Sequence, residues 1–435
     1  MKAPKPVLFL YLICLLQYGC QRDPHVDLGN GTPSSPDTPP AAKDLGMLYA
    51  ANTQISNGIT CVNLNKDSIE WQKRAFLSDN NGFVYDSGVI YTGNLYGATA
   101  LDAKTGITLW STNTSTLAHG QSGYTPSNQP ILHDSLLYLI TYAEHNYESP
   151  SLCCIRKSSG ALVWRQDLVV GLSPNWFYTT PVVVGDKLIA LSSAGSNETN
   201  RVHCFNRFTG TELWRVLTGP GSWRGNPTLL DDHHVLFTTN QNHVFKVSVD
   251  DGTVVHFWSV PPTEKLKPYL NILKKDGQLF IGADFGIHIV DAVTGQTLRE
   301  LKDTIFTYAV TSNTIYLRKL LGVVQAKDLA TFTTKWTWRS PLKHYVDSSN
   351  YYGVIDPKTS CLVSDDQYVY YYEMTPTGTS QIFNSIYILN AQTGALVKEI
   401  KLPTSYPVPV LGINQMVVRG NKAYRPVSNF IRFDW

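Results

Sequence analysis

Charged side chains are scarce in this sequence: Asp, Glu, Lys and Arg together make up 16% of its 435 residues. Their formal charges nearly cancel, which leaves a net charge of +2 at pH 7. No cluster of lysines and arginines stands out, so the chain lacks the basic surface that binds nucleic acids and other polyanions. We therefore expect no nucleic-acid partner.

Sequence motifs of catalytic and metal sites are also missing. There is no His-x-x-x-His or Cys-x-x-Cys pair, no acidic calcium loop, and no Gly-x-Ser-x-Gly, Walker or Gly-x-Gly-x-x-Gly pattern. His233 and His234 follow two aspartates in a predicted hairpin turn, where solvated side chains are more typical than metal ligands. The sequence therefore predicts no catalytic residues, no metal site and no cofactor.

Long hydrophobic runs are absent after residue 16. Residues 7–16 form an apolar run behind Lys2 and Lys5; it is too short to span a bilayer, which needs about 20 residues, and is typical of a signal peptide. Gly19-Cys20 follows and resembles a bacterial lipobox, with Gln17 where the usual pattern has Leu, Val or Ile. We expect residues 1–20 to be a lipoprotein signal peptide that ends at Cys20, the lipidated residue. Ordinary signal cleavage near Gly19 is the alternative.

Residues 21–44 are rich in Pro, Ser, Thr and Asp and show no apolar periodicity. Such a segment cannot bury enough surface to fold, so we predict a disordered tether. It would join the lipid anchor to one folded domain, residues 45–435. Gln21, rather than Asp, follows the cysteine, which favours the outer over the inner membrane.

What the chain does have is aromatic and β-branched residues in alternating runs, with 24 Tyr, 16 Phe and 10 Trp against 4 Met. This pattern predicts an all-β fold. In the stretch at residues 98–110 (ATALDAKTGITLW), a hairpin turn from Asp102 to Gly106 separates two strands, and the second strand contains Trp110. Similar stretches occupy residues 59–71, 152–164, 202–214, 247–258, 287–299, 324–336 and 386–398.

Two more strand-like runs precede most of these copies, most clearly at residues 180–192, where a Gly-Asp turn joins them. Each unit therefore has four antiparallel strands, and four-stranded units repeated every ~35–60 residues indicate a β-propeller. We predict eight blades, with seven as the alternative. To close the ring, we expect the C-terminus to begin a blade, with residues 407–411 innermost, residues 415–420 second and residues 430–434 third. Strands around residues 47–73 would complete this blade.

The repeated unit resembles the PQQ-type propeller repeat of quinoprotein alcohol dehydrogenases and of BamB, the lipoprotein of the outer-membrane β-barrel assembly machinery. The resemblance covers most of residues 45–435 and implies that the repeated tryptophans pack between adjacent blades. These are Trp71, Trp110, Trp164, Trp214, Trp258 and Trp336. The repeat is specific for fold and says little about function.

Five cysteines follow Cys20, and when the repeats are aligned on their tryptophans Cys61, Cys154 and Cys204 fall where Ala100 stands. We expect this position to be a buried slot for a small side chain. Some quinoprotein dehydrogenases carry a vicinal disulfide beside the quinone, and Cys153-Cys154 is such a pair. Neighbouring side chains of a strand point to opposite faces, however, so we expect no functional disulfide here.

A binding site would lie on the loops that enter each innermost strand and join the second and third strands, since these share one face of a propeller. Aromatic and arginine side chains gather on these loops, and such side chains dominate the energetics of interfaces. The candidate binding residues are His119, Trp176, Phe177, Trp223, Arg224, Tyr345 and Tyr351.

The sequence thus predicts an exported, lipid-anchored and non-catalytic propeller that acts as a protein-binding scaffold at the bacterial outer membrane. The resemblance to BamB implies a partner in β-barrel assembly. A glycan-binding surface lipoprotein is one alternative. A quinoprotein dehydrogenase is the other, and it alone would require PQQ and calcium.

Overall fold

The computed structural model describes residues 46–52, 58–74, 83–94, 97–113, 124–126, 130–143, 151–167, 175–176, 180–194, 201–218, 223–239, 241–267, 272–319, 322–341, 362–364, 367–376, 382–402 and 413–419. The chain divides into two units, Met1–Lys43 and Asp44–Trp435, and every described residue belongs to the second. The predicted signal peptide, Cys20 and the tether lie outside the described residues.

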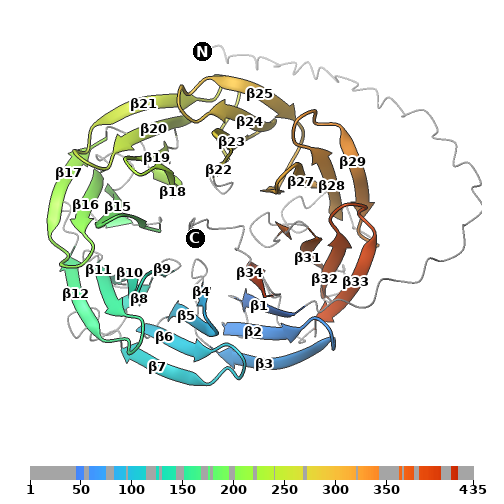
Figure 1. Ribbon diagram of the computed structural model, residues 1–435, viewed down its shortest axis with the longest axis horizontal. Helices are drawn as coiled ribbons and strands as arrows, with labels where there is room; N and C mark the ends of the chain where they lie inside the picture. Colours follow the sequence, from blue (N-terminus) through green and yellow to red (C-terminus); the bar gives the residue numbers. More distant parts are fainter. Residues whose placement is uncertain are drawn as a thin grey trace, which may run out of the picture. The chain divides into compact units, whose positions relative to one another are not determined.

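The second unit is an eight-bladed β-propeller of antiparallel sheets, as predicted (Figure 1). From the inside outward, blade 1 contains β34 (Ile413–Arg419), β1 (Met47–Asn52), β2 (Gly58–Asn63) and β3 (Ser68–Arg74); blade 2 contains β4 (Phe83–Asp86), β5 (Val89–Asn94), β6 (Gly97–Asp102) and β7 (Thr108–Asn113). In blade 3, β8 (Tyr124–Pro126) and β9 (Ile131–His133) precede β10 (Leu136–Ala143), β11 (Ser151–Arg156) and β12 (Leu162–Asp167). In blade 4, β13 (Asn175–Trp176) and β14 (Val182–Val184) precede β15 (Lys187–Ala194), β16 (Arg201–Asn206) and β17 (Glu212–Leu217).

The remaining four blades each take four consecutive strands. Blade 5 contains β18 (Trp223–Asp231), β19 (His234–Thr239), β20 (His243–Ser248) and β21 (Val254–Ser259); blade 6 contains β22 (Leu273–Lys275), β23 (Gln278–Ala283), β24 (Gly286–Asp291) and β25 (Thr297–Lys302). Blade 7 contains β26 (Thr307–Val310), β27 (Thr314–Lys319), β28 (Val323–Asp328) and β29 (Thr334–Arg339); blade 8 contains β30 (Leu362–Ser364), β31 (Tyr368–Pro376), β32 (Ile382–Asn390) and β33 (Leu396–Leu402). No α-helix occurs among the residues described.

The two ends of the folded unit share blade 1, but not in the predicted order. Strand β34, which we expected to be a second strand, is innermost and pairs antiparallel with β1. The N-terminal segment supplies the other three strands, so residues 47–63 are the second and third strands of this blade. Residues 407–411, predicted as innermost, and residues 430–434, predicted as third, lie outside the described residues.

Each third strand ends in the turn that the sequence repeats. The carboxylate of Asp102 accepts hydrogen bonds from the backbone N–H and the hydroxyl of Thr105, both at 2.7 Å, and these bonds lower the pKa of Asp102. Gly106 N–H donates to the Asp102 carbonyl at 2.8 Å and has a φ of 70°, which glycine adopts without steric strain. A bulge then shifts the register between Ala100 and Leu101, so that Ala100 lies opposite Trp110.

The core lies between the blades. Eight clusters of buried side chains fill the eight junctions, one for each pair of neighbouring blades. Tyr138 of β10 and Leu188 of β15, for example, share the cluster between blades 3 and 4. A single blade could not bury both of its faces, so the ring is the smallest unit that hides this apolar surface.

The connections between strands lie on two opposite faces. On what we call the turn face, the turn between the first and second strands meets the turn between the third and fourth, as where Ala103 N–H donates to the Gly88 carbonyl at 2.8 Å. On what we call the loop face, the chain enters the innermost strands and turns between the second and third strands; in blade 6, where part of the entering loop is described, the two connections meet. Lys267 N–H, for example, donates to the Gly282 carbonyl at 3.1 Å.

Candidate functional site

The predicted blade-packing tryptophans all lie in or against the clusters between blades. Five of them rest on the turn of the next blade and donate their indole N–H to a carbonyl there, as Trp164 does to Arg207 at 2.9 Å. A β-carbon on Gly210 would lie 2.7 Å from the Trp164 ring, so this turn also needs glycine for space. The five are Trp71, Trp110, Trp164, Trp214 and Trp336.

Trp258 lies at the junction of blades 5 and 6, but its spacing from the turn and its hydrogen-bond acceptor differ from those of the other five. By its distance from the turn glycine, His256 has the place of the other tryptophans. The bulge of this blade lies two residues further from the turn, so that Val244 pairs with Trp258 and Phe245 with His256. Trp258 is buried and donates its indole N–H to the Thr297 hydroxyl at 3.0 Å instead of to a turn carbonyl.

The predicted binding face is described only in part. Trp176 is in β13, beside Ser193 of β15, and Trp223 and Arg224 begin β18 opposite Thr239 and Thr238. These three residues therefore stand at the loop-face ends of the innermost strands of blades 4 and 5. His119, Phe177, Tyr345 and Tyr351 lie outside the described residues.

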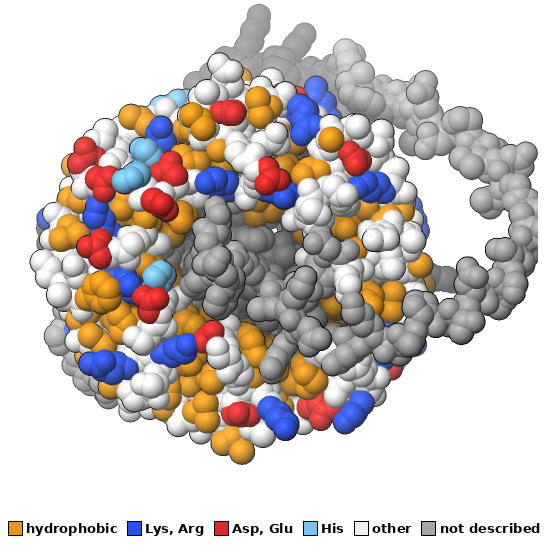
Figure 2. All heavy atoms as spheres, viewed as in Figure 1, with side chains coloured by type: hydrophobic (Ala, Val, Ile, Leu, Met, Phe, Trp, Pro, Cys, Tyr) orange, Lys and Arg blue, Asp and Glu red, His pale blue; other side chains and the backbone are white. Residues whose placement is uncertain are grey.

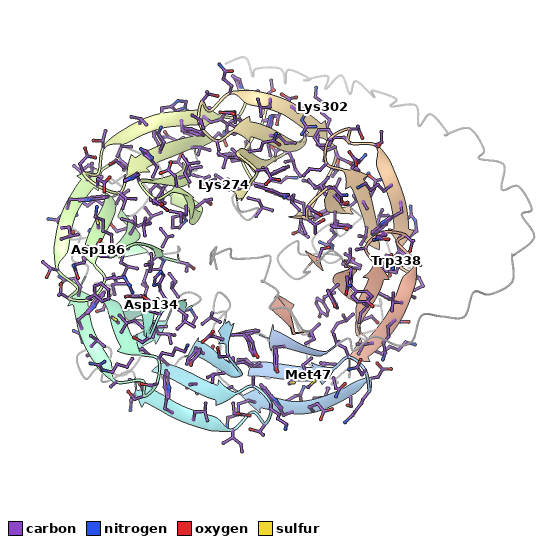
Figure 3. The ribbon with its side chains drawn as sticks, in the orientation of Figure 1. Met47, Asp134, Asp186, Lys274, Lys302 and Trp338 are labelled. Carbon is purple, nitrogen blue, oxygen red and sulfur yellow. The ribbon has the colours of Figure 1, made fainter. Side chains whose placement is uncertain are left out.

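The turn face is occupied by contacts that join neighbouring blades. Arg207 of blade 4 pairs with Asp134 of blade 3 at 2.6 Å, and Lys187 of blade 4 pairs with Asp250 of blade 5 at 2.7 Å. Figure 3 labels Asp134 on blade 3. The Arg207 bond lowers the pKa of Asp134, so this carboxylate stays charged well below neutral pH. Figure 2 shows acidic and basic side chains interspersed around the ring on the face in view.

Three side chains of blade 4 form a hydrogen-bonded chain that the sequence did not predict. His203 of β16 lies between Ser192 and Glu212, with its Nε2 2.9 Å from the Ser192 hydroxyl and its Nδ1 2.8 Å from a Glu212 oxygen. Since a carboxylate only accepts, Nδ1–H donates to Glu212, and this bond lowers the pKa of Glu212. The order of atoms is that of a Ser-His-acid triad.

The partners of these three residues argue for a structural role. Ser192 is 1% exposed and His203 2%, and both ring nitrogens of His203 already have partners within blade 4. The same position of the third strand makes a polar bond to the fourth strand in other blades, as between Thr99 and Ser111 at 3.2 Å. We interpret these hydrogen bonds as a link between strands. No sequence motif could have revealed them, because the three residues come from three separate strands.

Two further histidine clusters lie in blades 5 and 6. His243 and His256 both approach the Ser259 hydroxyl at 2.6 Å. The buried His288 lies 2.9 Å from Glu264 on the loop that enters blade 6. Across the part of the chain that is described, no group of three His, Cys, Asp or Glu side chains has the geometry to hold a metal ion. His233 is a solvated turn residue that pairs with Asp250 at 2.8 Å.

Three of the cysteines occupy the predicted slot for a small side chain. Cys61, Cys154 and Cys204 are buried opposite Trp71, Trp164 and Trp214, the slot that Ala100 fills in blade 2. Burial raises the pKa of each of these thiols to about 12, which makes them unreactive at neutral pH.

The Cys153–Cys154 pair does not fit a vicinal disulfide beside a quinone. Cys153 packs in the cluster between blades 2 and 3, whereas Cys154 packs in the cluster between blades 3 and 4. The two side chains therefore project from opposite faces of β11.

No helix among the described residues is long and apolar enough to cross a membrane.

Part of this ring matches the model of a known protein family. Two segments, residues 97–198 and 194–304, match the family described as outer membrane protein assembly factor BamB. Together they run from the third strand of blade 2 to the end of blade 6. No curated protein matches the chain at a significant level.

Several solved structures have a similar fold at low identity. The crystal structure of BamB from Moraxella catarrhalis is 17% identical, with 74% of this chain and 92% of that chain covered and a TM-score of 0.49. Dihydro-heme d1 dehydrogenase NirN is 12% identical over 88% of this chain and 78% of that chain, with a TM-score of 0.58. AztD from Citrobacter koseri is 10% identical over 82% and 94%, with a TM-score of 0.54. At these identities the likeness to NirN and AztD shows the fold alone.

Proposed function

We propose that this chain, a PQQ-like β-propeller that resembles BamB, is a non-catalytic scaffold that binds another protein at the bacterial outer membrane. The observation that carries the proposal is the match of residues 97–304 to a family described by its role in outer-membrane protein assembly. By this family the chain is a bacterial envelope protein. The specific partner we propose is a component of β-barrel assembly.

The loop face is the proposed binding surface. The turn face repeats the same backbone bonds from blade to blade, and ion pairs join neighbouring blades there. The loop-face connections differ in length and sequence from blade to blade, so they can carry specificity. Phe285, in the turn between β23 and β24, leaves 59% of its surface exposed on this face.

Lipidation at Cys20 and the tether of residues 21–44 complete the proposal. A diacylglycerol group on Cys20 would hold the propeller at the membrane, and the tether would let the loop face reach a membrane-embedded partner. Cys20→Ala should release the protein from the membrane fraction. A Cys20→Ala protein that stays in that fraction would contradict the lipid anchor.

The test is an affinity pull-down from membranes with the full-length chain, read by mass spectrometry. We expect recovery of a β-barrel assembly protein, and we expect Trp176→Ala and Trp223→Ala to reduce it. Phe208→Ala is the matched control, because Phe208 is 49% exposed on the turn face. Equal recovery with all three variants would contradict the loop face as the binding surface.

The same preparations separate the scaffold from its two competitors. Alcohol- or sugar-dependent dye reduction after addition of PQQ and calcium would contradict a non-catalytic role. Binding to a polysaccharide array that disappears in Trp176→Ala or Trp223→Ala, without recovery of an assembly protein, would favour a glycan-binding lipoprotein.

A further inference from the structure

Arg318 is a buried cation without a counter-charge among the described residues. It is the penultimate residue of β27 in blade 7, close to the loop face, and its side chain is 1% exposed. Its Nε and Nη1 atoms have no hydrogen-bond partner, and no described carboxylate pairs with it. Arg207, the other deeply buried arginine that is described, pairs with Asp134 at 2.6 Å.

Aromatic rings line the surroundings of Arg318. The guanidinium carbon lies 5.3 Å from the centre of the Phe306 ring and 5.9 Å from that of Tyr371, a residue of blade 8. Tyr316, two residues earlier in β27, points the same way and donates its hydroxyl to the Ala391 carbonyl of blade 8 at 3.2 Å. The guanidinium therefore lies at the junction of blades 7 and 8.

Among the described residues, nothing balances the charge of Arg318. An arginine does not lose its proton in a protein, and burying an unpaired ion costs several kcal/mol even after relaxation. Each cation–π contact returns about 0.5–2 kcal/mol, which does not offset that cost. Lys319, the neighbouring cation, already pairs with Asp303 at 2.9 Å and brings no further net charge.

We infer that Arg318 anchors a binding site for the carboxylate of a small organic acid, between blades 7 and 8. A carboxylate matches the guanidinium in shape and can take two parallel hydrogen bonds from it. The one guanidinium without a described partner can hold one carboxylate group of such an acid. The burial of Arg318 favours a small ligand over a side chain on the flat surface of a folded partner.

The test is calorimetric titration of the full-length chain in detergent with succinate as the probe, against sodium chloride at equal ionic strength. We expect saturable binding to the wild type and binding at least about tenfold weaker to Arg318→Met and to Arg318→Lys, since lysine keeps the charge but loses the planar fork. Arg339→Met is the matched control, an exposed arginine of the same blade, and should bind as the wild type does.

Thermal unfolding gives a second measurement that does not depend on the titration. Succinate should raise the melting temperature of the wild type more than that of Arg318→Lys. It should leave the melting temperature of Arg318→Met unchanged. Without succinate, Arg318→Met should be at least as stable as the wild type, because it removes an unpaired buried charge. Equal affinity of the wild type and Arg318→Met for succinate would overturn the site.

A peptide with an acidic C-terminus, titrated in parallel, identifies the source of the carboxylate. Arg318-dependent binding of succinate assigns the site to free organic acids. Arg318-dependent binding of the peptide alone assigns it to the end of another chain, and failure of both probes overturns the proposal. The loop-face pull-down is independent of this result, since neither Trp176 nor Trp223 belongs to the site.

Discussion

The junction between blades 3 and 4 and the junction that closes the ring, between blades 8 and 1, make the same contact with different side chains. In the first, Trp164 donates to the Arg207 carbonyl at 2.9 Å and lies flat on the turn at Gly210. In the second, Lys398 occupies the tryptophan position and donates to the Leu64 carbonyl at 2.7 Å. Lys398 also pairs with Asp67 at 2.7 Å.

The difference shows what the repeated position requires. At seven of the eight junctions a donor reaches the carbonyl of the next turn, whereas the bulk of the side chain varies; at the junction of blades 5 and 6, Trp258 donates to the Thr297 hydroxyl instead. At the junction of blades 6 and 7, Arg299 donates to the Ala330 carbonyl and lies 4.7 Å from the ring centre of Phe332, which replaces the turn glycine with a φ of 60°. At this repeated position the tryptophans contribute mainly buried area, and Lys398 contributes mainly polar bonds.

Removing a junction tryptophan should have the largest effect. Trp164→Ala deletes a side chain that is 9% exposed and leaves a cavity between two blades, so we expect a loss of about 3–5 kcal/mol in the free energy of unfolding. Urea unfolding followed by tryptophan fluorescence and circular dichroism measures it. Trp164→Phe, which keeps most of the apolar area, should lose less. Equal losses would mean that the hydrogen bond, not the area, dominates.

The turn glycine at the same junction should come second. Gly210→Ala places a β-carbon 2.7 Å from the Trp164 ring at a φ of 74°, and we expect a loss of about 2–4 kcal/mol from strain and overpacking together. Gly185→Ala is the control: its φ is 57°, but no atom lies within 4 Å of the added carbon. It should lose about 1–2 kcal/mol from the backbone alone. Similar losses in both variants would show that the Trp164 ring moves aside at little cost in free energy.

The closing junction should be weaker and sensitive to salt. Lys398→Met removes the donor to the Leu64 carbonyl and the ion pair with Asp67, and we expect a loss of about 1–3 kcal/mol. Raising the salt concentration should shrink the difference between wild type and variant, because the pair is partly exposed. A loss that is unchanged in high salt would show that packing of the lysine stem, not its charge, closes the ring.

The smallest effect should come from the hydrogen-bonded chain of blade 4. His203 lowers the pKa of Glu212 below its usual value of 4.5, with Arg201 and Arg215 acting in the same direction. The stabilisation is therefore present above pH 4.5 and disappears as the pH falls through the lowered pKa. Glu212→Gln should flatten the acid side of the stability–pH curve by less than about 1 kcal/mol. Identical stability–pH curves for the wild type and Glu212→Gln would show that the His203–Glu212 pair does not stabilise the fold.

The repeat made much of the ring predictable. Because Asp102, Gly106 and Trp110 recur at fixed spacing, the strands, the turn and the small-residue slot of Ala100 could all be aligned without coordinates. We predicted that a C-terminal strand joins the N-terminal blade, but not that β34 is its innermost strand. A short apolar run carries no signal of which neighbour it pairs with. Trp258 lies six residues after Gly252 rather than four, and the shifted bulge that brings it to the junction left no mark in the sequence.

The buried polar groups could not be predicted. Ser192, His203 and Glu212 meet because three adjacent strands are in register, and Arg318 meets Tyr371 only because blade 8 packs on blade 7. Neither arrangement has a fixed spacing in sequence. The binding loops are the part of the molecule that does not repeat, so the rule that located the ring gives no information about them.

The most direct test of the account compares two exposed side chains of blade 6 on opposite faces. Phe285 is 59% exposed on the loop face, and Val293 is 81% exposed in the turn between β24 and β25, on the turn face. A photocrosslinking residue at each position, in the full-length chain in its native membrane, reports which face meets another protein. We predict a discrete crosslinked protein from position 285 and none from position 293. A crosslinked partner from position 293 alone would contradict the assignment of binding to the loop face.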